Sequence, residues 1–155
     1  MVFYSFDTSS FLNGQRDLFP PATFPTLWEN IAAMIAAGDV RSIDLVRDEL
    51  EAKDDDVPRW AKEQADLFVP LTQDVQVSVR EVLAEHQKLI GVGSGRSGAD
   101  PFVIALARAR SGAVVTEELL SRNLNKPKIP DVCDAMGVRR LNLMQFIQEQ
   151  GWVFR

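Results

Sequence analysis

The stretch VFYSFDTSSFL (residues 2–12) decides the fold, because it joins an apolar run to one acid and then to three hydroxyl side chains. Residues 2–6 are rich in Val, Phe and Tyr, which favours a short buried strand. Buried strands avoid carboxylates, since an unpaired charge removed from water is strongly unfavourable. Asp7 therefore marks one of two things: a turn into a helix capped by the hydroxyls that follow, or a metal ligand at the carboxyl end of a strand.

The composition indicates one globular domain. With 155 residues, of which 46% are hydrophobic and 25% charged, the chain is long enough to bury a core, and we expect a single domain over residues 1–155. No apolar run approaches the ~20 residues of a membrane span, and the N-terminus lacks a signal pattern. A lone cysteine, Cys133, excludes an intrachain disulfide framework and a cysteine-rich zinc site. We expect a cytoplasmic protein without membrane contact.

Charge is divided unevenly along the chain. Residues 1–78 hold 14 acidic and 6 basic side chains, whereas residues 79–155 hold 8 acidic and 11 basic ones. This distribution excludes a uniformly basic nucleic-acid-binding protein. The distribution remains compatible with a protein that has an acidic side and a basic side. The acidic side would attract cations or a basic partner.

Strand and helix patterns alternate along the chain, which indicates an α/β sandwich of three layers, with a mostly parallel central sheet flanked by helices. Strands are predicted at 2–6, 39–43, 112–116 and 139–143. Helices are predicted at 26–37 (behind a capping box of Thr26 and Glu29), 44–52, 60–69, 73–90 and 101–110. Loops are predicted at 13–25 and 91–100, where Gly and Pro gather.

A second acid lies on the apolar face of a predicted helix. In LVRDEL (residues 45–50) the helical period places Glu49 on the side of Leu45, Val46 and Leu50. An acid on a buried stripe calls for a partner. The alternative is that Glu49 lies at the edge of the stripe and extends to water.

Further acids occupy comparable places. Asp100 precedes Pro101, which is the signature of a helix N-cap and is explained by capping alone. Glu117 and Glu118 follow an apolar strand as Asp7 does, and ligands of parallel sheets gather at the carboxyl ends of strands.

Taken together, these acids are more specific than any one of them. A cluster of like charges is unfavourable without cations, and a set of ligands made only of oxygen atoms favours Mg²⁺ or Mn²⁺ over zinc. The sequence therefore predicts a site for one of these two ions.

The order of YSFDTSS, VRDEL, GADPFVIALA and VVTEE resembles the PIN domain, the fold of VapC-type toxin ribonucleases, over nearly the whole chain. PPATFPTLWENI, GADPFVIALA, VVTEE and KIPDVC are similar to a bacterial PIN-like family long catalogued without an assigned function. The resemblance places Asp7, Glu49 and Asp100 on the metal-binding acids and Glu118 on the fourth acid, with Glu117 as its alternative. Thr8 and Thr116 match hydroxyls that flank the site.

The resemblance implies a metal-dependent endoribonuclease with Mg²⁺ or Mn²⁺. It also implies the toxin of a toxin–antitoxin pair, which forms a homodimer and binds a protein antitoxin. The basic half of the chain supplies candidates for contact with RNA phosphates, namely Arg96, Arg122, Lys126 and Lys128. Two other functions stay open at this point: a PIN-like module that binds nucleic acid or protein without cleaving it, and a nuclease specific for DNA or for nucleic-acid structure.

Three residue types receive structural rather than catalytic roles. We expect Cys133 to be a buried apolar residue and His86 to lie at the surface of a helix, far from the acids. Trp28, Trp60 and Trp152 are interpreted as core or interface residues rather than platforms for base stacking.

Overall fold

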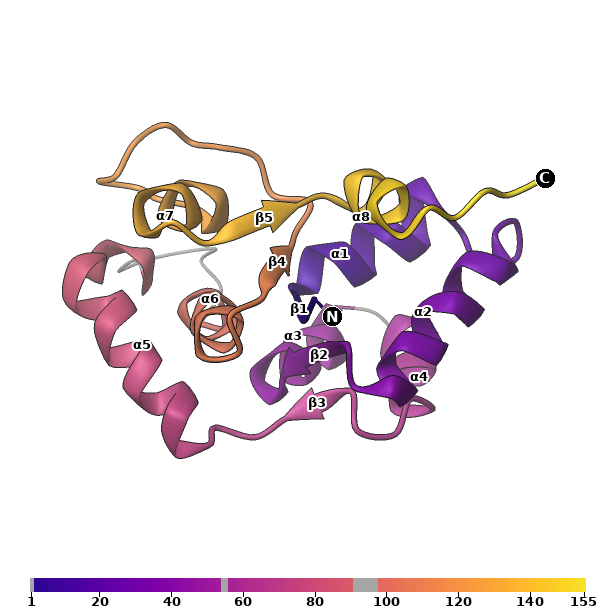
Figure 1. Cartoon of the computed structure of the whole chain (residues 1–155), viewed down its shortest axis with the longest axis horizontal. Helices are drawn as coiled ribbons and strands as arrows, with labels where there is room; N and C mark the ends of the chain where they lie inside the picture. Colours follow the sequence, from indigo (N-terminus) through magenta and orange to yellow (C-terminus); the bar gives the residue numbers. More distant parts are fainter. Residues whose placement is uncertain (1, 54–55, 91–97) are drawn as a thin grey trace.

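The computed structural model describes residues 2–53, 56–90 and 98–155, and its centre is a parallel sheet of five strands with helices on both faces (Figure 1). The strand order is β3-β2-β1-β4-β5, and every pairing is parallel. The strands are β1 Tyr4–Phe6, β2 Val40–Ile43, β3 Phe68–Val69, β4 Ala113–Val115 and β5 Arg139–Leu141. The α/β class and the parallel sheet predicted from the sequence are confirmed.

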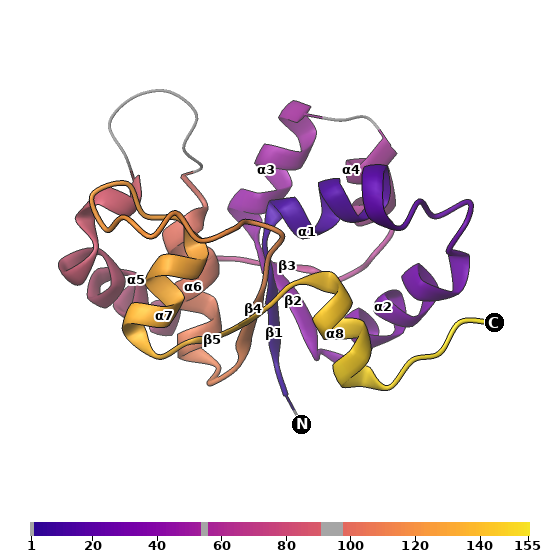
Figure 2. The same cartoon turned by 90° about the horizontal axis from the view of Figure 1, so that it is seen from above.

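Two groups of helices enclose the sheet. Figures 1 and 2 both place α5, α6 and α7 on one side of the strands and α1, α2, α4 and α8 on the other. The helices are α1 Thr8–Asn13, η1 Gly14–Leu18, α2 Pro25–Ala37, α3 Asp44–Lys53, α4 Asp56–Lys62, α5 Gln73–Glu85, η2 Gln87–Ile90, α6 Asp100–Ala109, α7 Ile129–Met136 and α8 Leu143–Gln150. The arrangement is the three-layer sandwich that the sequence predicts.

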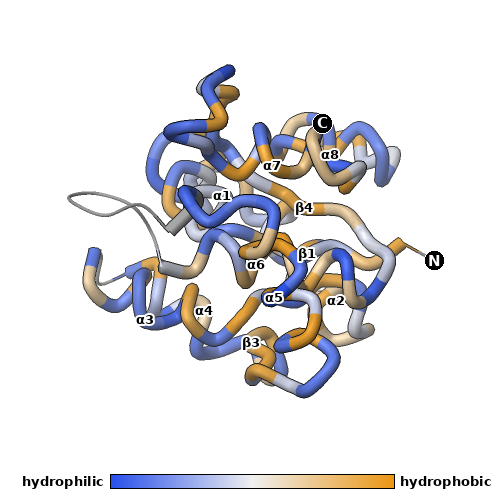
Figure 3. Tube along the Cα trace, turned by 90° about the vertical axis from the view of Figure 1, so that its left-hand side faces the viewer, coloured by the Kyte–Doolittle hydropathy of each residue, from blue (hydrophilic) through white to orange (hydrophobic). Residues whose placement is uncertain are grey.

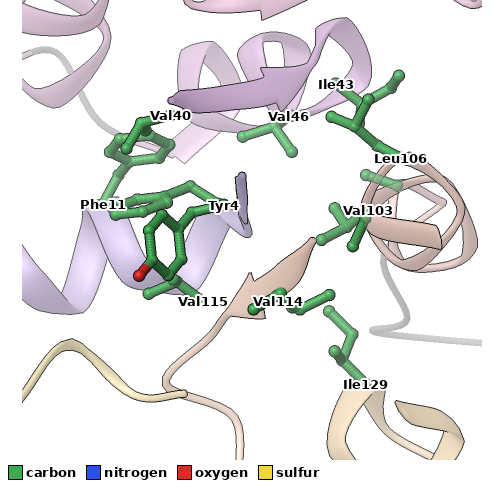
Figure 4. Close-up of a cluster of buried hydrophobic side chains, with 14 of the residues drawn as sticks. Tyr4, Phe11, Val40, Ile43, Val46, Val103, Leu106, Val114, Val115 and Ile129 are labelled. Atoms are coloured by element: carbon green, nitrogen blue, oxygen red, sulfur yellow. The ribbon is translucent and has the colours of Figure 1, made fainter. Parts of the chain in front are cut away.

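The core runs through the middle strands. In Figure 3 the tube is in orange shades at β4, and much of the outer chain is blue. Figure 4 shows Val103 and Leu106 of α6 on one side of this core and Phe11 of α1 on the other. Residues 103–107 of α6 are fully buried, so this helix is apolar all round and forms the centre of its layer.

Two buried serines tie the central strand to its neighbours. Ser5 Oγ of β1 donates to the carbonyl of Val103 at 2.8 Å, which fixes the first turns of α6 against the strand. Ser42 Oγ of β2 donates to the carbonyl of Phe6 at 2.6 Å. Because Phe6 directly precedes Asp7, both bonds help to set the position of the acid that ends β1.

The predicted loop at 13–25 contains regular structure at its start. Gly14–Leu18 forms a π-helical turn that continues α1, and the amide of Phe19 donates to the carbonyl of Gly14 at 2.7 Å. A Cβ on residue 14 would lie 2.6 Å from Leu143 Cδ1, so only glycine allows this turn to pack against α8. The prediction missed the turn because contacts from distant elements produce it.

Several element boundaries differ from prediction. Helix α2 begins at Pro25 after Phe24, with no side-chain cap, so the capping box of Thr26 and Glu29 is wrong. The helix predicted at 60–69 is α4, which ends at Lys62, and Phe68 belongs to the edge strand β3. A strand of two residues is too short for its period to be read from sequence.

Other predictions for single residues fared differently. Two predictions are confirmed. Gly38 ends α2 with a φ of +89°, as a left-handed C-cap requires. Cys133 is fully buried, and burial raises the pKa of its thiol to about 12.

The predicted surface position of His86 is wrong. Helix α5 ends at Glu85, and the His86 side chain that follows is only 11% exposed. Within the described ranges of the chain, no helix has the length and apolar character needed to cross a membrane.

Gly112 provides a test of the packing at the start of β4. A Cβ there would lie 2.2 Å from the carbonyl oxygen of Phe3, a backbone atom that cannot move aside. We expect Gly112→Ala to lower the free energy of unfolding by about 2 kcal/mol in urea denaturation. Gly98→Ala is the control, because its methyl meets open space, and an equal loss in both variants would contradict the packing argument.

The pH dependence of stability has an identifiable contribution at α8. Glu149 accepts one hydrogen bond from Arg139 Nη2 at 2.9 Å and another from the hydroxyl of Tyr4. These bonds, and above all the one from Arg139, lower the pKa of Glu149 from 4.5 to about 2. This contribution is complete above pH 4.5 and is lost as the pH falls towards about 2. The stability difference between wild type and Glu149→Gln should shrink over that range in denaturation curves, and a constant difference would refute the assignment.

Candidate metal centre

Asp7 lies at the carboxyl end of the central strand. Its amide donates to the carbonyl of Val115 at 3.0 Å, which continues the pairing of β1 with β4, and its own carbonyl accepts from Ser10 as α1 begins. The residue is 3% exposed. Asp7 thus occupies the N-cap position of α1, where no side chain makes a capping hydrogen bond, and it is a buried carboxylate at a strand end.

Two hydroxyls hold the Asp7 carboxylate. Ser9 Oγ and Thr116 Oγ1 donate to Oδ2 at 2.7 and 2.9 Å. Burial raises the pKa of Asp7, and these hydrogen bonds, with those from the backbone of Thr8 and Ser9, act in the opposite direction. No ion pair joins Asp7 to a Lys or Arg among the residues that the structure describes.

Glu118 is electrostatically coupled to this carboxylate. Its backbone amide donates to Thr116 Oγ1 at 3.1 Å, so the same hydroxyl contacts the Asp7 carboxylate and the backbone of Glu118. Burial above all, together with the charges of Asp7, Glu49 and Asp131 and against that of Lys128, raises the pKa of Glu118 to about 7. The structure thus brings Glu118, Asp7 and Glu49 within electrostatic reach of one another.

Glu117, the alternative fourth acid, is turned towards another element. Its Oε1 accepts a hydrogen bond from the amide of Leu143 at 2.6 Å, at the first residue of α8. A carboxylate at this place satisfies a helix amide that has no partner within the helix. Glu117 and Glu118 are neighbours in sequence, yet their side chains have different surroundings. The Glu117 side chain binds the start of α8, whereas the Glu118 side chain lies within electrostatic reach of Asp7 and Glu49.

The other two acids come from helices at the same edge of the sheet. Asp100 is the first residue of α6 and is 7% exposed; Ala99 rather than Asp100 occupies the N-cap position, one residue before the predicted place. Glu49 is half-buried on α3, the helix that follows β2. Figure 2 shows α3 and the start of α1 together, beyond the ends of β2 and β1.

An ordered loop carries three of the basic candidates. Arg122, Lys126 and Lys128 are exposed on the segment between β4 and α7. Asp131 accepts from the amides of Ser121, Arg122 and Lys128 at 2.8 to 3.0 Å, which holds Arg122 at a φ of +59°. Burial raises the pKa of Asp131, but these bonds outweigh it and keep the pKa below its usual value.

The basic candidates differ in their relation to the acids. Of the three, Lys128 lies close enough to lower the pKa of Glu118. Arg96, the fourth candidate, lies outside the described residues. Thr116 contacts Asp7 directly, whereas Thr8 Oγ1 is buried and has no hydrogen-bond partner in the described part of the chain.

The donors and charges fit a divalent cation. Asp7 is buried without an ion-pair partner among the described residues, and three other acids, Asp7 among them, repel the charge of Glu118. The hydroxyl of Thr8 has no hydrogen-bond partner in the same part of the chain. Oxygen ligands of this kind suit Mg²⁺ or Mn²⁺. Across residues 2–53, 56–90 and 98–155, no three His, Cys, Asp or Glu side chains form a ready metal-binding group. The arrangement is thus a set of carboxylates at one edge of the sheet rather than a preformed cage.

Sequence reasoning missed the role of Ser9. The prediction treated the hydroxyls after Asp7 as helix caps, but Ser9 Oγ bonds the Asp7 carboxylate, lies 3.2 Å from Thr116 Oγ1 and accepts the amide of Glu117 at 2.9 Å. It connects the end of β1 to the end of β4. The only signal in the sequence was its spacing of two residues from an acid.

Comparison with known proteins agrees with this fold. The family model described as "Domain of unknown function (DUF4411)" matches residues 4–154, and no curated protein matches the chain. Among solved structures the chain is similar to VapBC2 from Rickettsia felis, in a crystal structure bound to a DNA fragment from their promoter. The TM-score is 0.57 and the sequence identity is 13%, and the match covers 91% of this chain and 98% of that one. At this identity the likeness concerns the fold, and it confirms the PIN-like architecture expected from the sequence.

The coupling of Glu118 predicts an unusual effect of mutation. Because its pKa rises from 4.5 to about 7, ionisation of Glu118 destabilises the protein increasingly as the pH rises through that range. In EDTA at pH 8, Glu118→Gln should be more stable than wild type by on the order of 2 kcal/mol, with no difference near pH 4.5. Denaturation curves measure this, and Glu117→Gln is the adjacent control. Equal stability of Glu118→Gln and wild type at pH 8 would contradict the coupling.

Proposed function

The chain belongs to the family described as "Domain of unknown function (DUF4411)", and from its PIN-like fold and its coupled carboxylates we propose that it is a metal-dependent endoribonuclease that hydrolyses RNA phosphodiesters. The observation that carries the proposal is the burial of Asp7 without an ion-pair partner among the described residues, close enough to Glu118 for its charge to raise the pKa of that acid. A binding module that does not cleave has no need of such an unfavourable concentration of charge.

Within the proposal, Asp7, Asp100 and Glu118 hold Mg²⁺ or Mn²⁺, and Glu49 supports them. An ion bound there supplies positive charge that polarises the phosphate, activates water for in-line attack and stabilises the leaving oxygen. The chain's own contribution is position: Ser9 and Thr116 fix one oxygen of Asp7, and this leaves the orientation of the carboxylate little freedom.

In this proposal the substrate phosphates contact the basic loop between β4 and α7. The charge of Lys128 lowers the pKa of Glu118, and Asp131 orders the loop that carries Arg122 and Lys126. Amides held by a buried carboxylate give these flexible side chains a rigid base, so less freedom is lost when they contact phosphates.

The resemblance to VapC-type toxins and the likeness to VapBC2 support a biological setting, a cytoplasmic toxin that forms a homodimer and is inhibited by a protein antitoxin. The acid excess in residues 1–78 favours a basic segment in that partner. Occupation of the acidic edge by such a segment would both neutralise its charge and exclude RNA.

The proposal predicts that cleavage depends on both the ion and the acids. Purified protein should cleave a labelled structured RNA with Mn²⁺ or Mg²⁺ and not with EDTA, and Asp7→Asn and Asp100→Asn should each reduce the rate at least about a hundredfold. Asp134→Asn is the matched control, because Asp134 pairs with Arg140 on the surface of α7 and β5.

The outcomes separate the functions considered from the sequence. Cleavage retained by both Asp→Asn variants would overturn the site assignment. Metal binding without cleavage of RNA or DNA would overturn the nuclease and favour a binding module. Metal-dependent cleavage of DNA alone would overturn the choice of RNA.

A further inference from the structure

The basic loop between β4 and α7 (residues 116–128) carries a group of exposed leucines beside its cations. Leu119 is 79% exposed, Leu124 56% and Leu120 38%. Of the large hydrophobic side chains that the structure describes, Leu119 is the most exposed. Exposed leucines that are scattered singly are normal on a protein surface, whereas a group of them marks a candidate interaction site. The proposed nuclease gives these three side chains no role.

Hydrogen bonds hold the first two leucines in an ordered backbone. Before them, the amide of Glu118 donates to Thr116 Oγ1 at 3.1 Å. After them, the amide and the hydroxyl of Ser121 donate to Asp131 Oδ2 at 3.0 and 2.8 Å. Because the chain is fixed on both sides of the pair, a partner that buries these leucines does not have to order the backbone first.

A tight turn presents the third leucine. The amide of Lys126 donates to the carbonyl of Asn123 at 3.0 Å, which places Leu124 and Asn125 at the tip of the turn. The side chain of Asn125 is held from outside the loop, since its Oδ1 accepts a hydrogen bond from Lys88 Nζ of η2 at 2.8 Å. Leu124 is therefore exposed by the course of an ordered backbone.

The cations of the same loop form no ion pairs within the part of the chain that the structure describes. Residues 119–128 contain no acid and three basic side chains, Arg122, Lys126 and Lys128. The ion pairs that the structure describes lie elsewhere, for example between Arg140 of β5 and Asp134 of α7. The loop thus combines exposed apolar side chains with positive charge.

This combination fits a protein segment better than a nucleic-acid strand. RNA phosphates account for the cations, but an aliphatic side chain has neither a charge for a phosphate nor an aromatic face on which a base stacks. A protein segment with carboxylates beside apolar side chains matches both features of the loop. Its carboxylates meet the cations, and its apolar side chains cover the leucines.

The same charge disfavours a second copy of this loop as the partner. Contact between identical loops across a twofold axis would bring the cations of both copies together, and like charges that face each other across an interface are unfavourable. A separate acidic chain meets no such repulsion. The occupant that fits is therefore a segment of another protein, in which aspartate or glutamate lies beside leucine, isoleucine or valine.

The loop lies beside the candidate metal centre. Leu119 directly follows Glu118, the acid whose pKa the charge of Asp7 helps to raise. Figure 2 shows the loop, in orange, beyond the end of β4 and on the same side of the sheet as the start of α1. A partner on the leucines therefore covers the cations that the proposed nuclease uses for RNA phosphates.

We propose that residues 119–128 are a docking surface for an acidic, leucine-containing segment of a partner protein, and that this partner inhibits cleavage by covering the cations of the loop. The inhibitory role rests on the proposed nuclease function and deepens it, because it assigns a regulator to that site. The contact is separate from the acidic edge of the sheet, for which a basic segment is proposed above.

The test is the binding of a designed probe to the full chain in EDTA. The probe is a short fluorescent peptide of alternating leucine and glutamate, and its two controls replace every leucine with serine or every glutamate with glutamine. Fluorescence anisotropy should show binding of the leucine–glutamate peptide and at least about tenfold weaker binding of both controls. Leu119→Ser should weaken binding of the leucine–glutamate peptide about tenfold as well.

Leu18→Ser is the matched control variant, because Leu18 is an exposed leucine on η1, outside the loop. It should bind the peptide as wild type does. Both variants should melt at the temperature of wild type, since each changes an exposed side chain. Equal peptide binding by wild type and Leu119→Ser would overturn the proposal, and so would the absence of peptide binding by wild type.

Two further measurements identify other occupants. Labelled RNA in EDTA should bind Leu119→Ser as it binds wild type, and the leucine–glutamate peptide should displace it. Weaker RNA binding by Leu119→Ser would assign the leucines to RNA and overturn the docking surface, whereas RNA that the peptide does not displace would overturn the inhibitory role. Sedimentation should give wild type and Leu119→Ser the same oligomeric state, and a dimer lost in the variant would assign the loop to a second copy instead.

Failure here differs from failure of the nuclease. The peptide titration contains neither a divalent ion nor RNA, so binding that depends on Leu119 supports the docking surface even where RNA is not cut. Cleavage of RNA by a chain that does not bind the peptide supports the nuclease and removes the docking surface.

Discussion

The structure is organised around one electrostatic constraint, a carboxylate buried at the end of its central strand. Asp7 is held by Ser9 and Thr116, which come from the first turn after β1 and from the end of β4. Neither hydroxyl carries positive charge, so they orient the carboxylate without neutralising it. The surrounding sheet must therefore be rigid enough to keep an unfavourable charge in place, and the serine hydrogen bonds on either side of β1 contribute to that rigidity.

Much of the fold could be predicted because the decisive signals are local. An apolar run before an acid identified β1, glycine identified the end of α2, and Asp100 before Pro101 identified the start of α6 within one residue. The π-helical turn could not be predicted in this way, since it depends on the contact of Gly14 with residues far along the chain. A periodic pattern contains no information on such contacts.

The site was predictable as a set of residue types but not as a set of contacts. Glu117 and Glu118 have the same chemistry and follow the same strand, so sequence left the fourth acid open. In the structure, Glu117 binds the first amide of α8, and Glu118 shares Thr116 with Asp7. The difference depends on the position of α8, which lies far along the chain and supplies the amide that Glu117 binds.

The division of charge in the sequence acquires a spatial meaning from this arrangement. Asp7 and Glu49 belong to the acidic half, whereas Lys128 and the loop ordered by Asp131 belong to the basic half. A nucleic-acid strand carries its charge on its phosphates. The basic loop is thus suited to the backbone of a strand, and the carboxylates to an ion. Because the two sets of side chains differ in charge, the groups that hold a strand need not compete with those that hold an ion.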